Sequence, residues 1–112
     1  MAFDEGLAER IREIVEDWAN VSERKMFGGL AFMQEGHMFV GIIDDALMAR
    51  VGAEQYREAL LRPHVREMDF TGRPMKGYVY VDPEGVDSDE ELTSWVELAS
   101  QFVSTLPPKK PT

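Results

Sequence analysis

The side chains best suited to bind another molecule form a basic and aromatic group in the second half of the chain. The group consists of Arg62, Arg66, Arg73, Lys76 and Tyr78. Arginine pairs with carboxylates and phosphates through parallel hydrogen bonds, and tyrosine and arginine are enriched where proteins bind each other. These residues are therefore the best candidate for an interaction surface with an acidic partner or a phosphate. A solvated rim that only balances the acidic residues elsewhere is the favoured interpretation, because scattered surface arginine is common.

A second motif, Met26-Phe27-Gly28-Gly29, precedes an apolar run. Adjacent glycines could present backbone N–H groups to an anion. A phosphate-binding loop is normally followed by the N-terminus of a helix, however, and here the pattern of a strand follows. We therefore predict a structural role, a bulge or a close backbone approach within one strand at about residues 24–33, with a break of the strand at Gly28-Gly29 as the alternative.

Residue types that perform catalysis or bind metals are not arranged in a recognisable way. The chain has no cysteine, and His37 and His64 stand in no metal-binding spacing. The serines lie in no nucleophile motif. The acidic residues 82–91 lack the glycine that a calcium loop needs at its sixth position, and those at a helix start complement its dipole. We therefore expect a non-enzymatic protein with no catalytic residue, metal or cofactor.

Length and charge narrow the class of protein further. The chain has 112 residues and a formal charge of −9. An acidic chain repels phosphates on average, so direct nucleic-acid binding is not expected. No apolar stretch approaches the roughly 20 residues of a membrane span, and the N-terminus lacks the pattern of a signal peptide. We expect a cytoplasmic protein without membrane contact.

Hydrophobic periodicity predicts three helices and five strands. The helices are expected at about 5–19, 53–61 and 88–106, with Asp4 and Ser88 as N-caps. The strands are expected at about 24–33, 38–43, 47–51, 65–70 and 77–81, with tight turns at 35–36 and 44–45. The order helix, three strands, helix, two strands, helix predicts a two-layer α+β domain, an antiparallel sheet with helices packed on one face. We expect a single domain over residues 1–112, with its core at about 4–106 and a tail at 107–112.

Two blocks of residues resemble the N-terminal domain of the TfoX/Sxy family of bacterial competence regulators. The residues that carry the resemblance are Lys25 to Gly29, Phe32, Gly36, Met38, Phe39, Leu47 to Val51 and Gly72 to Tyr78. The similarity covers roughly residues 7–106. It implies a two-layer fold similar to secretion-chaperone-like domains and a stand-alone, single-domain member, because full-length regulators carry a second, C-terminal domain. It implies no catalytic residues.

Two functions fit this sequence. The first is a regulatory domain that works by contact with a protein partner, either another protein or a second copy of the chain. Methionines in or beside the expected strands could supply an adaptable binding face, but packing in the core and on the sheet face is the favoured role. The second function is a small-molecule-binding or enzymatic domain with a site near Arg73–Lys76, which requires a deep pocket with converging polar groups.

Overall fold

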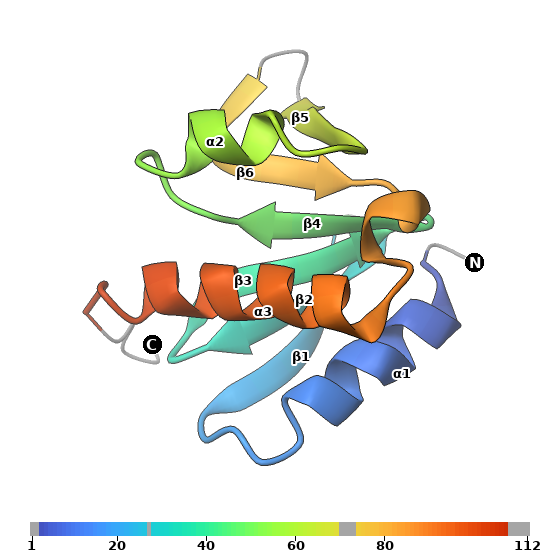
Figure 1. Cartoon of the computed structure of the whole chain (residues 1–112). Coiled ribbons are helices and arrows are strands. Elements are labelled where there is room, and N and C mark those ends of the chain that lie inside the picture. The colour runs from blue at the N-terminus through green and yellow to red at the C-terminus, as the bar shows by residue number, and fades with distance from the viewer. Residues whose placement is uncertain (1–2, 27, 70–73, 108–112) are drawn as a thin grey trace.

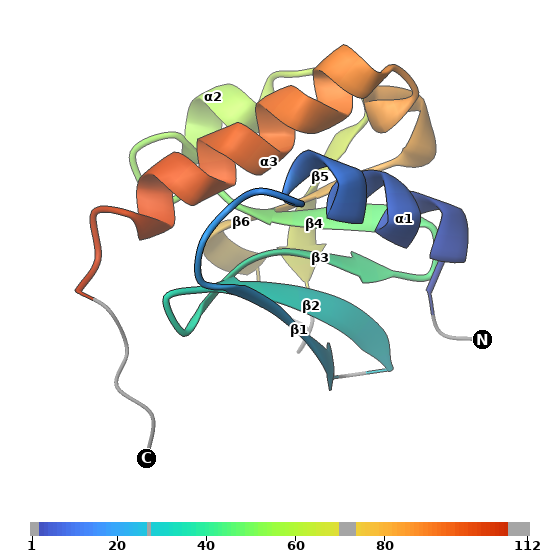
Figure 2. The same ribbon diagram turned by 90° about the horizontal axis from the view of Figure 1, so that it is seen from below.

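The computed structural model describes residues 3–26, 28–69 and 74–107, and in these ranges an antiparallel sheet of six strands carries three α-helices on one face (Figures 1 and 2). The helices are α1 (Glu5–Ile14), α2 (Tyr56–Leu60) and α3 (Asp89–Val103), and η1 (Pro83–Val86) is a short 3-10 helix. The strands are β1 (Val21–Met26), β2 (Gly29–Gln34), β3 (His37–Ile43), β4 (Ala46–Arg50), β5 (Val65–Asp69) and β6 (Pro74–Val81). Their order across the sheet is β1-β2-β3-β4-β6-β5. The predicted α+β class, with helices on one face of an antiparallel sheet, is confirmed.

The prediction of a single strand over 24–33 is wrong, because the chain reverses at Gly28. Gly28 has a φ of 74°, a left-handed conformation that glycine adopts readily, and Met26 pairs with Gly29 across the turn. β1 and β2 are therefore the two strands of a hairpin, and the sheet has six strands instead of five. The predicted bulge is replaced by this turn, and Phe27 lies outside the described residues.

Gly29 permits a close approach between β2 and β3. A Cβ atom at this position would collide with the backbone carbonyl oxygen of Ile42 and come within 3.2 Å of Ile43 Cγ1. Backbone atoms inside a sheet cannot turn aside as the end of a flexible side chain can. The close backbone approach predicted for the glycine pair is therefore confirmed at its second residue.

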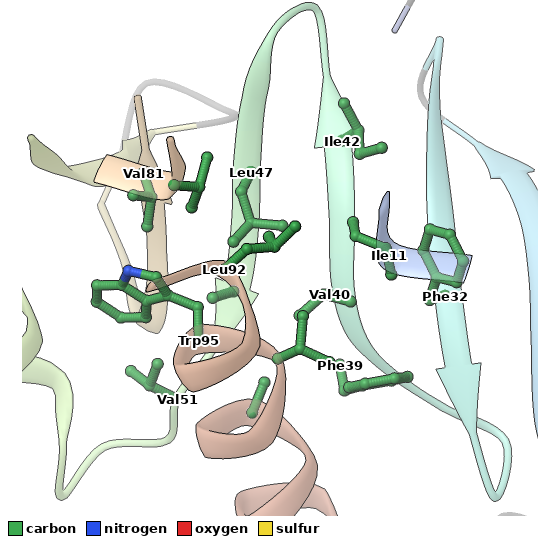
Figure 3. Packing of buried hydrophobic residues seen from close by; sticks show 14 of the residues in the cluster. Ile11, Phe32, Phe39, Val40, Ile42, Leu47, Val51, Val81, Leu92 and Trp95 are labelled. Carbon is green, nitrogen blue, oxygen red and sulfur yellow. The ribbon is translucent and has the colours of Figure 1, made fainter. Parts of the chain in front are cut away.

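An irregularity in the pairing of β2 with β3 turns two successive side chains into the core. Phe32 pairs with Val40 and Met33 pairs with Met38, so Phe39 is an extra residue between the two pairs. An extra residue interrupts the alternation of side chains along a strand. Phe39 and Val40 are accordingly both fully buried in the same apolar cluster (Figure 3).

The core lies between the sheet and the helices. Trp95 and Leu92 of α3 and Ile11 of α1 belong to one cluster with Leu47 and Ile42 of the sheet (Figure 3). All five side chains are at most 1% exposed. Because full burial of one large apolar side chain contributes about 1.5–3 kcal/mol, this layer is the main source of stability.

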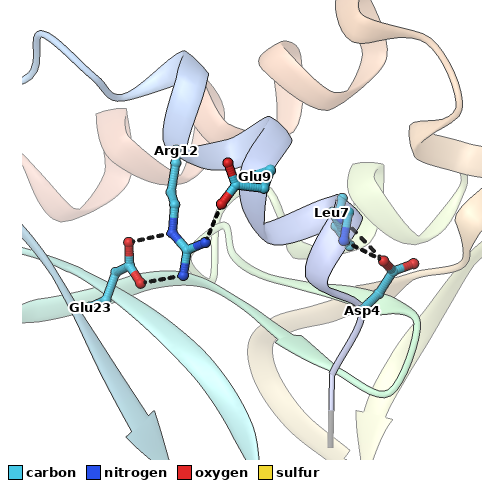
Figure 4. A network of polar contacts seen from close by, with 6 residues as sticks. Asp4, Leu7, Glu9, Arg12 and Glu23 are labelled. Carbon is cyan, nitrogen blue, oxygen red and sulfur yellow. Dashed lines mark hydrogen bonds and ion pairs between the residues drawn. The ribbon is translucent and has the colours of Figure 1, made fainter. Parts of the chain in front are cut away.

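Polar contacts start helix α1 and attach it to the edge of the sheet (Figure 4). The Asp4 carboxylate accepts hydrogen bonds from two backbone N–H groups of the first turn, at 2.8 and 3.2 Å, which confirms the predicted N-cap. Arg12 donates to Glu9 of the same helix at 2.6 Å and to Glu23 of β1 at 2.7 Å. These contacts hold α1 against the edge strand β1.

Helix α3 begins at the predicted capping residue, because the Ser88 hydroxyl accepts a hydrogen bond from the Glu91 backbone N–H at 3.0 Å. Replacing Ser88 by alanine should lower the free energy of unfolding by about 1 kcal/mol, since this N–H group loses its partner. Urea unfolding measures the change. Ser104→Ala, which removes a hydroxyl that donates to the Ser100 carbonyl, is the matched control and should change stability by less than about 0.5 kcal/mol. Equal losses in the two variants would contradict the capping role.

Candidate functional site

Two neighbouring rows of side chains cross the sheet on opposite faces. One row passes through β5, β6, β4, β3 and β2 and consists of Val65, Val81, Leu47, Ile42 and Leu30. These side chains belong to the core or pack against it, so the row faces the helices. Because successive residues of a strand point to opposite sides, the next row lies on the face that no described helix or strand covers (Figure 2). We call this side of the sheet the uncovered face.

A continuous row on the uncovered face, which we call the cross-sheet ladder, runs through all six strands. It consists of Arg66, Tyr80, Met48, Gly41, Ala31 and Arg24, each paired in register with the next. The ladder begins and ends with arginine on the two edge strands, and the residues between are uncharged. Among the strand positions that the structure describes on this face, none is Asp or Glu. The described strand positions of the uncovered face thus carry arginine and no acid, in a chain whose net charge is −9, and Asp82, directly after β6, pairs with Arg66 at the edge of this face.

The centre of the uncovered face is apolar and closely packed. A Cβ atom at Gly41 would come within 2.8 Å of Met48 Cε, so the end of the Met48 side chain lies over Gly41. Met33 and Met38 pair on the same face and are half-buried. Methionine adapts to irregular partners more readily than branched side chains do. Met48 and Ala31 are only 5% and 1% exposed, so the accessible apolar side chains of the centre are the half-buried Met33 and Met38.

Arg50 is the last residue of β4, and its guanidinium lies between the ring of Tyr78 in β6 and the ring of Phe102 in α3, at the end of the sheet next to the helical layer. Its guanidinium carbon is 5.6 Å from the centre of the Tyr78 ring and 5.5 Å from the centre of the Phe102 ring. The guanidinium donates one long hydrogen bond, 3.5 Å, to the Met38 carbonyl oxygen. No carboxylate among the described residues lies within ion-pairing distance of Arg50. The two rings therefore restrain this cation while most of its N–H groups have no partner in the described part of the protein.

Arg66, in contrast, is paired with an acid. It donates to Asp82 with distances of 2.7 Å from Nη2 and 3.0 Å from Nε, and its guanidinium carbon lies 5.1 Å from the centre of the Tyr80 ring. The hydrogen bonds lower the pKa of Asp82 and raise the pKa of Arg66. Among the residues that the structure describes, Arg50 and the exposed Arg24 have no carboxylate partner, so both remain available to an external anion.

Stability should fall at acidic pH because two carboxylates are paired with arginine. Hydrogen bonding to Arg66 lowers the pKa of Asp82, and hydrogen bonding to Arg12 lowers the pKa of Glu23. A carboxylate whose pKa is lower in the folded state stabilises that state above its ordinary pKa of about 4, and the contribution is lost as the pH falls through the folded-state pKa. We therefore expect the free energy of unfolding to decrease below about pH 4.

Urea unfolding at pH 7 and at acidic pH measures this dependence. The decrease should be shallower in the Asp82→Asn and Glu23→Gln variants than in the unmodified chain. Glu97→Gln, which changes an exposed acid of α3, is the control and should leave the dependence unchanged. Identical pH profiles in all the variants would rule out these two ion pairs as its cause.

Comparison with protein families identifies the domain that carries this face. The model of the TfoX N-terminal domain matches residues 13–103, a span that includes all six strands, α2 and α3. The chain belongs to the TfoX N-terminal domain family. The predicted family is therefore confirmed. No curated protein matches the chain.

The structure divides the basic and aromatic group that the sequence of this TfoX N-domain predicted as one surface. Arg66 and Tyr78 lie on the uncovered face. Arg62 lies on the helical side, with its guanidinium carbon 3.8 Å from the centre of the Trp95 ring. Lys76 is exposed in β6, and Arg73 lies outside the described residues. The alternative ligand site near residues 73–76 depends in part on residues outside the described ranges and stays a prediction.

The other side chains considered for chemistry lie apart in this TfoX N-domain. His37 of β3 has Nε2 2.7 Å from the Pro107 carbonyl oxygen, and His64 precedes β5. Within residues 3–26, 28–69 and 74–107, no three His, Asp or Glu side chains gather as metal ligands do. No helix in these ranges is long and apolar enough to cross a membrane. The expected absence of a metal or cofactor stays a prediction.

Sequence patterns did not indicate Arg50 and Arg24 as members of the site. Met48 and Arg50 are far in sequence from Arg66 and Tyr80, and the pairing of β4 with β6 brings them together, whereas Arg24 lies on β1 at the opposite edge of the sheet. A signal was present in the alternation along β4, which places Met48 and Arg50 on the side opposite the core.

Proposed function

We propose that this TfoX N-domain is a non-enzymatic regulatory domain that binds a protein partner through the uncovered face of its sheet. The observation that supports the proposal is the cross-sheet ladder, an apolar centre bordered by Arg66 and Arg24 on the two edge strands. An antiparallel sheet covered on one side usually carries polar residues on the other. Here the outward positions of the central strands include Met38, Ile43 and Met48.

The composition of this face is that of a protein interface. Tyrosine, methionine and arginine are enriched at the centre of such interfaces, whereas lysine and the acids are depleted. The face combines methionines with Tyr78, Tyr80 and Arg50. Tyrosine supplies a large contact area with few rotatable bonds, and arginine supplies directed hydrogen bonds. The same three residue types on the side of the sheet opposite the helices favour docking over simple hydration.

Position-specific cross-linking tests the proposal. The chain has no cysteine, so a single engineered cysteine can carry a photoreactive cross-linker. Met38→Cys places it on the uncovered face, and Glu97→Cys places it on an exposed position of α3 as the matched control. In cells that naturally make the protein, we expect illumination to give a discrete protein adduct from position 38 and none from position 97. Mass spectrometry then identifies the partner.

Adducts from position 97 alone, or equal adducts from both positions, would place the contact elsewhere and overturn the proposal. An absence of adducts from both positions would also count against it, provided that both labelled variants unfold at the same urea concentration as the unmodified chain.

A further inference from the structure

We infer that the segment recognised by the uncovered face is an acidic, apolar peptide of another protein, and that Arg50 binds one of its carboxylates. This inference rests on the proposed function and adds the chemistry of the partner. Its starting point is a restrained arginine for which the described residues supply no acidic partner, next to half-buried apolar side chains.

The surroundings of Arg50 fix its guanidinium without neutralising it. The Tyr78 and Phe102 rings lie 5.6 and 5.5 Å from its central carbon, and the bond to the Met38 carbonyl is 3.5 Å long. Within the described residues, no carboxylate pairs with it. A planar guanidinium that is already oriented loses less entropy when it binds a carboxylate through two hydrogen bonds.

The distribution of charge selects an acidic partner. The chain carries a net charge of −9, yet the described strand positions of the uncovered face include Arg24, Arg50 and Arg66 and no acid. Arg66 is neutralised by Asp82, whereas Arg50 and Arg24 have no carboxylate partner in the described part of the chain. Complementary charge of this kind steers encounter and suppresses partners of the wrong sign.

The neighbours of Arg50 indicate apolar residues beside the acid. Tyr78, Met38 and Met33 are half-buried on the same face, so each can bury more surface when it is covered. A partner that supplied only a carboxylate would leave these apolar side chains exposed to water. A segment in which Asp or Glu adjoins leucine-like or aromatic residues fills both requirements.

Two other occupants fit less well. Two copies of this face brought together would oppose the unpaired arginines of each copy, and like charges across an interface are unfavourable. A nucleic acid presents a phosphate at every nucleotide, and its affinity depends on neutralising many of them. Arg50 and Arg24 offer few such contacts in a chain of charge −9. One carboxylate beside apolar groups requires only the single restrained arginine.

Selection from a library of random short peptides displayed on phage tests the inference with the full chain as bait. The enriched peptides are then synthesised and their Kd values measured by fluorescence anisotropy. We expect them to share Asp or Glu next to apolar residues. Arg50→Gln should weaken their binding roughly 10- to 100-fold, the loss expected for hydrogen bonds to a charged group. Arg50→Lys should bind with intermediate affinity, because it keeps the charge and loses the paired geometry.

Arg57→Gln is the matched control, since it removes an exposed arginine from α2 on the other side of the sheet. Its effect should be less than about threefold, as for an exposed charge. Urea unfolding must show that Arg50→Gln is folded under the binding conditions. If it is not, the comparison of Arg50→Lys with the unmodified chain decides the outcome.

Enriched peptides that are unaffected by Arg50→Gln but blocked by Met38→Glu would overturn the carboxylate contact and leave docking on the uncovered face intact. Peptides unaffected by either change would overturn the inference and count against the proposed function as well. A failure to enrich any peptide would overturn the inference alone, because the cross-linking experiment tests the face independently. Tighter binding of single-stranded oligothymidylate, lost in Arg50→Gln, would identify a nucleic acid instead.

Discussion

Replacement of Trp95 by alanine lowers the free energy of unfolding by about 3–5 kcal/mol, the usual cost of removing a fully buried aromatic side chain. Trp95 is 1% exposed and lies in the middle of α3, in one cluster with Leu47 and Val81 of the sheet. The substitution leaves a cavity at the contact between the two layers. It also removes the ring over which Arg62 lies. Urea unfolding followed by circular dichroism measures the loss.

Leu61→Ala is the matched control for Trp95, because Leu61 is a large apolar residue with 85% of its surface exposed. We expect this control to change stability by less than about 0.5 kcal/mol. Since a domain of this size is stable by only about 5–15 kcal/mol, Trp95→Phe provides a milder second variant with a smaller loss. Similar losses of unfolding free energy in Trp95→Ala and Leu61→Ala would show that Trp95 is not buried in the core as described.

Gly29→Ala should be the second most damaging change, with a loss of about 1–3 kcal/mol. The new methyl group would collide with the Ile42 carbonyl oxygen, which is part of the backbone of β3. One of the two strands must therefore move, and their hydrogen bonds must lengthen. Thermal and urea unfolding measure the loss, and a shift of the β2–β3 amide signals in an NMR spectrum locates it.

Gly6→Ala is the control for Gly29→Ala, since it is the same substitution in helix α1. The nearest atom to its added methyl group is Asp4 Oδ1 at 3.2 Å, at the end of a side chain that can turn. Alanine is better than glycine in a helix by up to about 1 kcal/mol, so this variant should be neutral or more stable. If both variants were destabilised to the same degree, the close backbone approach at Gly29 would not explain the loss.

Features that depend on residues close together in the sequence, such as helix caps and tight turns, could be predicted. Asp4 and Ser88 start their helices as expected, because a capping side chain bonds to the N–H groups two or three residues later. The turns at Glu35 and Asp44 were also expected, and both residues have positive φ angles, 53° and 55°. The turn at Gly28 was missed because Phe-Gly is not among the usual hairpin dipeptides, which are Asn-Gly and Asp-Gly.

The candidate site could be predicted only in part, since it depends on which strands are neighbours. Arg66 and Tyr78 were found because they are close in sequence. Their positions next to Tyr80 and Arg50 follow from the insertion of β6 between β4 and β5, an order that local patterns do not determine. The absence of an acid beside Arg50 among the described residues is likewise a property of the assembled sheet, because it depends on where other elements place their acids.

The identity of the two outermost strands bears on how this chain behaves at high concentration. β1 and β5 each leave one side of their backbone open to pairing with another molecule. β1 carries Glu23, Arg24 and Lys25 in succession, and β5 carries Arg66 and Glu67. Charged side chains along an open border oppose the stacking of identical strands that begins fibril growth. The chain can thus keep apolar side chains for recognition on one face of its sheet, while the charged edge strands oppose polymerisation.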